Sequence, residues 1–142
     1  MAVVCKIDRE FRLLVADDDP GFRETVTDFL HPHYETIAVG SGEEAIEVVE
    51  RRTIHLVLMD VHMHVLNGVD TVRIVRSIRD ELPCILITSD FSEGIVESAR
   101  DEGAYAVLRK PPQRRHLLHT ITSALEECYG DLFDQSRDVP KN

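Results

Sequence analysis

The chain has 142 residues, of which 43% are hydrophobic and 30% are charged, and its formal net charge is −10. This length supports one domain with a sizeable core, and no apolar run approaches the roughly 18 residues that a membrane span requires. The acidic balance argues against direct nucleic-acid binding, and three widely spaced cysteines indicate no disulfide framework, so we expect a cytoplasmic protein without a membrane partner.

Short apolar runs alternate with helical patterns along the chain. The first run, Leu13–Ala16, is apolar throughout, as expected for a strand that is covered on both faces. Asp19-Pro20 then predicts the start of a helix, with Asp19 as its N-cap. Tyr34–Val39 is the second predicted strand, and the capping pattern Ser41-Gly42-Glu43-Glu44 opens the second helix.

The second half of the chain repeats this alternation. The later elements are a third strand over Ile54–Met59, a helix after the turn Asn67-Gly68, a fourth strand over Cys84–Ile87, a short Gly94-containing helix over Ser92–Asp101, a fifth strand over Ala106–Leu108 and a last helix from about Gln113 to Tyr129. Five strands in strict alternation with five helices predict a doubly wound parallel sheet with helices on both faces.

The same pattern sets the expected domain bounds and helix faces. Residues 11–130 are expected to form the domain, after an N-terminal extension of residues 1–10 and before a polar tail or linker of residues 131–142. Helical spacing predicts that Ile78 and Cys128 face inward on the third and last helices. The stripe Arg73, Arg76 and Arg79 is expected to face solvent.

Polar side chains stand where four of the predicted strands end. The first strand runs into Asp17-Asp18, the third into Asp60 and the fourth into Thr88, and the fifth leads through Arg109 to Lys110. Ligands of an open parallel sheet bind outside the carboxyl ends of its strands, so these side chains are expected to form one site.

The residue types at this site are those of phosphoryl transfer to a carboxylate. Mg²⁺ prefers oxygen ligands, and Asp17, Asp18, Asp60 and the backbone carbonyl of His62 are the predicted set. Asp60 would attack a phosphoryl group and form an aspartyl phosphate. The Lys110 ammonium and the Thr88 hydroxyl would neutralise or bind the phosphoryl oxygens, because such transfer depends mainly on positioning and charge.

The chain resembles the receiver domains of two-component response regulators over about residues 11–128. The residues that carry the likeness are the acidic pair Asp17-Asp18, the segment Asp60-Val61-His62-Met63-His64-Val65-Leu66-Asn67-Gly68, Thr88 at the end of the fourth strand and Lys110-Pro111 after the fifth. The resemblance implies a flavodoxin-like α/β sheet of order 2-1-3-4-5 and a cis peptide between Lys110 and Pro111.

The resemblance also implies partners and an activity. A sensor histidine kinase or a phosphotransfer protein would supply the phosphoryl group, and a downstream protein would read its presence. The reaction would be acceptance and hydrolysis of that group, not enzymatic turnover of a substrate. A homodimer through the face formed by the Ser92–Asp101 helix, the fifth strand and the last helix is also compatible with the family.

The sequence departs from the family pattern around the expected switch. His64 replaces the usual proline, Val107 stands where the fifth strand usually carries an aromatic, Pro112 follows Pro111 where an aromatic or aliphatic is common, and Tyr105 lies two residues too early to replace the aromatic. Val107 is small, so we expect Thr88 to move on phosphorylation and the Asp90–Glu97 segment to carry the signal.

Three other readings remain open. The chain could be the N-terminal receiver of a longer regulator, or a degenerate receiver that serves as an interaction module without phosphorylation. It could also be an acid-based phosphohydrolase, although such enzymes commonly carry a second acid two residues after the nucleophile, where this chain has His62.

Overall fold

The computed structural model describes residues 10–130. The N-terminal extension, except Glu10, and the C-terminal tail that the sequence suggests lie outside the described residues. Within the described part, no helix combines the length and the apolar character needed to cross a membrane.

Five parallel strands form one sheet in the order β2-β1-β3-β4-β5. Their bounds are Arg12–Ala16 (β1), Glu35–Val39 (β2), Leu56–Asp60 (β3), Cys84–Thr88 (β4) and Ala106–Arg109 (β5). Every residue of β3 and β4 is buried, which explains why these two segments read as apolar runs. The predicted α/β fold and strand order are therefore confirmed.

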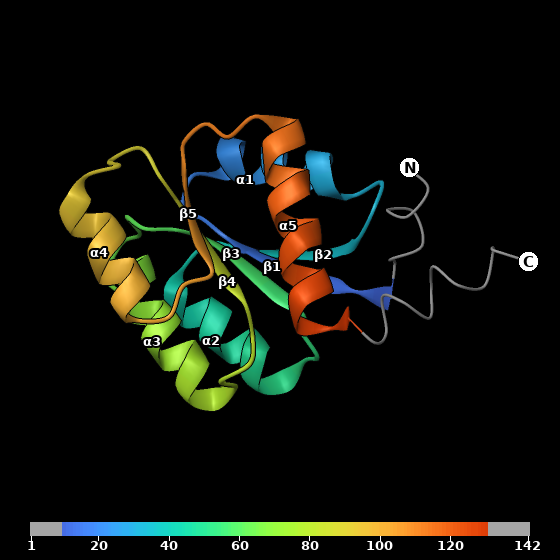
Figure 1. Cartoon of the computed structure of the whole chain (residues 1–142), viewed down its shortest axis with the longest axis horizontal. Coiled ribbons are helices and arrows are strands. Elements are labelled where there is room, and N and C mark those ends of the chain that lie inside the picture. The colour runs from blue at the N-terminus through green and yellow to red at the C-terminus, as the bar shows by residue number, and fades with distance from the viewer. Residues whose placement is uncertain (1–9, 131–142) are drawn as a thin grey trace, which may run out of the picture.

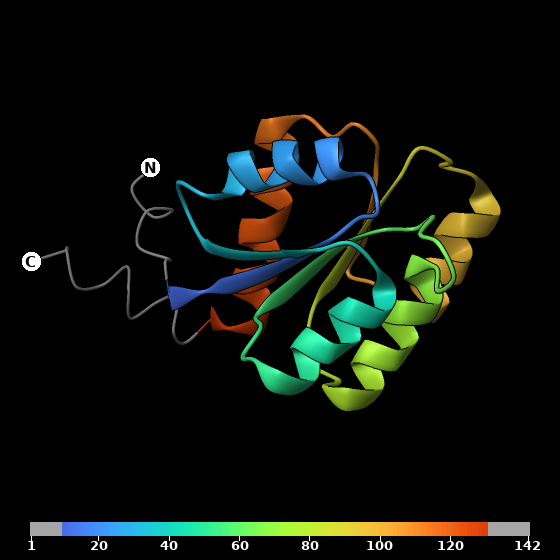
Figure 2. The ribbon, with the colours of Figure 1, turned by 180° about the vertical axis from the view of Figure 1, so that it is seen from behind.

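Two layers of helices cover the sheet (Figures 1 and 2). The helices are Pro20–Leu30 (α1), Gly42–Arg51 (α2), Gly68–Ile78 (α3), Glu93–Asp101 (α4) and Arg114–Cys128 (α5). Side chains from α1 and α5 share one hydrophobic cluster with the sheet, and side chains from α2, α3 and α4 share the other.

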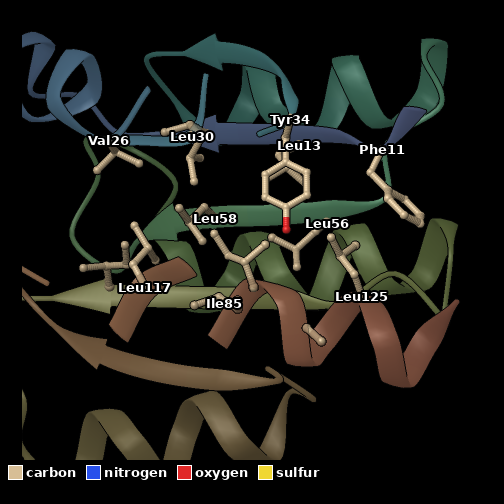
Figure 3. Packing of buried hydrophobic residues seen from close by; sticks show 14 of the residues in the cluster. Phe11, Leu13, Val26, Leu30, Tyr34, Leu56, Leu58, Ile85, Leu117 and Leu125 are labelled. Atoms are coloured by element: carbon tan, nitrogen blue, oxygen red, sulfur yellow. The ribbon is translucent and has the colours of Figure 1, made fainter. Parts of the chain in front are cut away.

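The cluster under α1 and α5 shows how the helices are held (Figure 3). Val26 and Leu30 of α1 and Leu117 of α5 are fully buried against the strands. Burial of one such side chain contributes about 1.5–3 kcal/mol to folding. Tyr34 lies among them, and its hydroxyl is 3.2 Å from the hydroxyl of Thr122, so its polar end is satisfied inside the core.

Polar side chains cap the first four helices, of which the sequence predicted the caps of the first two. Asp19 accepts a hydrogen bond from the Gly21 N–H and Ser41 accepts one from Glu44, while Asn67 and Ser92 cap α3 and α4. Glu44 itself accepts from the Gly40 N–H. Gly103, just after α4, has a φ of +91°, which only glycine adopts at low cost.

Some sequence predictions are wrong in detail. Tyr34 precedes β2, because its N–H donates to the Leu30 carbonyl and closes the turn after α1. Ile54 likewise precedes β3. Ile78 is 38% exposed and Cys128 is also exposed; they are the last residues of α3 and α5.

The arginines of α3 do not form a solvated stripe. Only Arg73 is exposed. Arg76 donates to the Leu82 carbonyl at 3.1 Å, and Arg79 donates to two carbonyls near the end of α2, Val49 at 3.2 Å and Arg52 at 3.1 Å. The two Arg79 bonds satisfy backbone acceptors that the end of α2 leaves open.

At their other ends, α2 and α3 also approach closely. A Cβ on Gly42 would collide with the Thr71 hydroxyl, so α2 lies against α3 at a distance that only glycine permits. The two helices are thus joined near both ends.

Candidate functional site

Four strands deliver the predicted residues to one edge of the sheet. Asp17 follows β1 and is 1% exposed, while Asp60 ends β3 and is 7% exposed. Asp18 lies beside them on the surface. One carboxylate oxygen from each of the three lies within 4.8 Å of the others. The structure therefore brings together the three carboxylates among the four predicted metal ligands.

Lys110 balances part of this charge. Its Nζ donates to Asp17 Oδ2 at 3.0 Å and to Asp60 Oδ2 at 3.2 Å. Burial alone would lower the pKa of Lys110, but the two carboxylates outweigh it and raise the pKa above its ordinary value. The lysine is therefore charged at neutral pH. The predicted cis peptide between Lys110 and Pro111 is confirmed.

Asp17 is the acid most affected by its surroundings. Burial raises its pKa, and the nearby charge of Asp60 raises it further. The Asp19 N–H, which donates to Asp17 Oδ1 at 2.8 Å, and the Lys110 ammonium both oppose this shift. The net direction is upward, so keeping the buried Asp17 carboxylate charged lowers the stability of the fold.

The segment after β3 directs two N–H groups at the acids. The His62 N–H donates to Asp60 Oδ1 at 3.2 Å, and the His64 N–H donates to Asp18 Oδ2 at 3.1 Å. Proline at position 64 could not make the second bond, because proline has no N–H to donate. Gly68 packs on the backbone of Asp60, and a Cβ there would collide with the Asp60 carbonyl oxygen.

Thr88 is fully buried, and its hydroxyl faces the β4–α4 segment. It accepts a hydrogen bond from the Asp90 N–H at 2.9 Å and lies 3.3 Å from the Asp90 carbonyl oxygen. The structure thus brings Thr88 to the correct edge of the sheet, but two hydrogen bonds tie its hydroxyl to the backbone of Asp90. The Asp90 side chain in turn lies 3.6 Å from His62 Nε2.

Two further residues of the site escaped sequence reasoning. The Phe22 ring lies 4.1 Å from Lys110 Nζ, and Arg23 donates to the Asp17 carbonyl at 2.6 Å. Both stand in the first turn of α1, a few residues after the acidic pair. That proximity in sequence was the available signal.

The donor set suits a small, hard cation. Three carboxylates at one edge can supply the one or two direct oxygens that Mg²⁺ usually takes from a protein. The adjoining ammonium and N–H groups can hold the oxygens of a phosphoryl group. The arrangement can therefore bind a metal and a phosphoryl group side by side.

Comparison with known proteins supports the fold. The family model of the response regulator receiver domain matches residues 13–122. A CheY-like receiver domain from Methanospirillum hungatei has a TM-score of 0.82 at 24% identity and covers 85% of this chain and 98% of that one. Chemotaxis protein CheY4 of Vibrio cholerae has a TM-score of 0.77 at 27% identity, with coverages of 81% and 98%.

Curated relatives are longer proteins. Transcriptional regulatory protein PdtaR of Mycobacterium tuberculosis is 34% identical over 116 residues, which are 80% of this chain and 56% of the relative. Transcriptional regulatory protein GlrR of Escherichia coli is 28% identical over 116 residues, or 81% of this chain and 26% of the relative. The chain thus spans about half or less of these relatives. With the family model matching most of its length, the chain belongs to the receiver domain family of two-component response regulators.

Proposed function

We propose that this chain is a phosphorylatable receiver in the cytoplasm. Asp60 accepts a phosphoryl group from a sensor histidine kinase or a phosphotransfer protein, and the phosphorylated domain changes its contacts with a downstream protein or a second copy of itself. The observation that carries this proposal is the pairing of Lys110 with both Asp17 and Asp60, with Asp18 beside them.

The reacting carboxylate is held in place before the donor arrives. Gly68 packs on the backbone of Asp60, and the His62 N–H bonds one of its oxygens. An oxygen of Asp60 attacks the phosphorus, the bond from phosphorus to the donor breaks, and the donor leaves with that electron pair. Fixing the acceptor in this way lowers the barrier by orientation.

Lys110 follows the charge as it moves. Its ammonium pairs with Asp60 Oδ2 before transfer. After transfer that carboxylate is an acyl phosphate, and the ammonium pairs with a phosphoryl oxygen instead. The Thr88 hydroxyl and the His62 N–H would donate to the remaining oxygens. Donors that are already in place stabilise developing charge without reorganisation.

The carboxylates of Asp17, Asp18 and Asp60 and the carbonyl of His62 would hold Mg²⁺. When bound, this ion would supply positive charge opposite the phosphoryl oxygens. Without such a charge, Lys110 faces three acids alone, which is why we expect labelling to require the cation.

Intact mass after incubation with Mg²⁺ and acetyl phosphate tests the proposal. The protein should gain the mass of one phosphoryl group, and Asp60→Asn should abolish the gain. Asp28→Asn, an exposed aspartate on α1, is the matched control and should label normally. Labelling of Asp60→Asn would reassign the acceptor, and absence of labelling in every variant would favour the degenerate receiver.

A further inference from the structure

Phe91 is an exposed aromatic side chain that the chemistry of the site does not use. It stands in the segment between β4 and α4 and is 37% exposed. Three surface hollows of about 440, 330 and 230 Å³ share it as a lining residue. The first also borders α4, and the other two border Val107 of β5. The ring therefore has room to move on either side.

One short path links this ring to the site through the chain. Thr88 lies three residues before Phe91, and its hydroxyl bonds the backbone of Asp90, the residue next to Phe91. A hydroxyl has one proton to donate. If Thr88 gives that proton to a phosphoryl oxygen, its donation to the Asp90 carbonyl is lost and the turn that positions Phe91 loosens.

A second path reaches the same ring from β5. The guanidinium carbon of Arg109 lies 4.6 Å from the centre of the Phe91 ring. Arg109 pairs with Thr88 across the sheet and is the neighbour of Lys110, which bonds Asp17 and Asp60. A shift of Lys110 toward a phosphoryl group thus acts on the residue that holds the ring.

We propose that Phe91 couples the state of Asp60 to the surface formed by α4 and β5, by leaving Arg109 and entering the hollow of about 230 Å³ that Val107 lines and Arg109 does not. This inference rests on the proposed function and adds the residue that transmits it. Val107 is a small, half-buried side chain, so the hollow over it can accept a ring. The contacts of Phe91 differ in the two positions, and only such differences allow a ligand to shift the equilibrium between them.

The test uses amide NMR shifts of the whole chain on adding Mg²⁺ and beryllofluoride, a phosphoryl mimic. In the unmodified protein, shifts should appear at residues 17–19 and 60–62 and also at residues 93–107. Phe91→Leu should keep the first set and reduce the second by about threefold or more, because leucine lacks the ring whose contacts differ between Arg109 and the hollow beside Val107. Acetyl phosphate labelling of this variant should be unchanged.

Two further variants make the result specific. Phe91→Trp should restore the response at residues 93–107, and it introduces the chain's only tryptophan, whose quenching by acrylamide should change about twofold on activation. Phe29→Leu, a half-buried aromatic on α1, is the matched control and should respond as the unmodified protein does.

The outcomes separate this inference from the function beneath it. A full response at residues 93–107 in Phe91→Leu overturns the role of Phe91, as does normal labelling of the unmodified protein without any response there. Failure to label, with no shifts at residues 17–19 and 60–62, would instead overturn the proposed function.

Discussion

Charge gathers at the carboxyl ends of the strands, whereas aromatic rings gather at the amino ends of the same sheet. At the first edge Asp17, Asp60 and Lys110 lie in hydrogen-bond contact. At the second, the ring centres of Phe11 and His55 lie 5.1 Å apart and those of His55 and Tyr129 lie 5.3 Å apart. The first edge holds carboxylates that repel one another, and the second holds aromatic rings that pack together.

Hydrogen bonds also hold His55 within the aromatic edge. The Arg12 N–H donates to His55 Nδ1 at 3.0 Å, and the Tyr129 hydroxyl donates to the His55 carbonyl at 2.9 Å. Burial raises the pKa of Tyr129 to about 12, so this hydroxyl keeps its proton at any ordinary pH. The residues that stabilise the fold and the residues that carry the chemistry thus lie at opposite ends of the strands. We expect that substitutions at one edge can be made without changing the property that the other edge provides.

The largest expected effect comes from Phe11→Ala. Phe11 is 4% exposed and contacts both His55 and Tyr129, so its loss leaves a cavity and should lower the free energy of unfolding by about 3–5 kcal/mol. Urea unfolding measures the loss. Labelling of the folded protein by acetyl phosphate should persist at its normal level. A well-folded Phe11→Ala protein that no longer labels would show that the two edges are coupled.

A smaller loss is expected for Tyr129→Phe. This change keeps the ring and removes only the hydrogen bond to the His55 carbonyl, so the free energy of unfolding should fall by about 1 kcal/mol. Urea unfolding with the same slope and a lower midpoint would fit. An unchanged midpoint would mean that water replaces the lost donor fully.

Acid should weaken the aromatic edge through His55. Burial first, and then the charges of Arg12 and Arg79, lower the pKa of His55, with Glu10 opposing. The fold thus favours neutral His55. This stabilisation is present above the ordinary histidine pKa of about 6.5 and is lost as pH falls through the lowered folded value.

The free energy of unfolding of the unmodified chain and of His55→Gln, measured as pH falls below about 6.5, isolates the contribution of His55 to the pH dependence. His33 also has a pKa lowered by burial, so some pH dependence should persist in the variant. Identical pH dependence in the two proteins would remove His55 from the explanation.

The smallest change, and one of opposite sign, is expected for Asp18→Asn. The variant removes one of three neighbouring negative charges but keeps an oxygen that can accept from the His64 N–H. In the absence of metal its Tm should rise by about 1–2 °C. Mg²⁺ should raise the Tm of the unmodified protein and leave that of Asp18→Asn nearly unchanged, because only binding to the folded state stabilises it. A fall in Tm without metal would mean that Asp18 stabilises the charged edge.

Periodicity predicted the strands, because buried parallel strands read directly as apolar runs. Their order was implied by the resemblance to receiver domains, and the edge that carries the site followed from the rule that ligands bind at the carboxyl ends of the strands. The side chains at the strand ends then followed from topology. Long-range partners could not be predicted in this way. Nothing in the residues around Arg79 points to the Val49 carbonyl, thirty positions away. Nor does the Asp17-Asp18 pair reveal that the first acid is buried and the second exposed.

The two attachments between α2 and α3 give the molecule a stiff half. Gly42 against Thr71 near one end, and Arg79 against the α2 carbonyls near the other, leave the two helices little freedom to slide separately. On the opposite flank, open space surrounds the Cβ position of Gly94, and hollows border α4. A structural change that starts at Asp60 should therefore displace the flank at α4 more than the α2–α3 pair. Arg79, at the end of α3, thereby helps to determine which side of the domain moves.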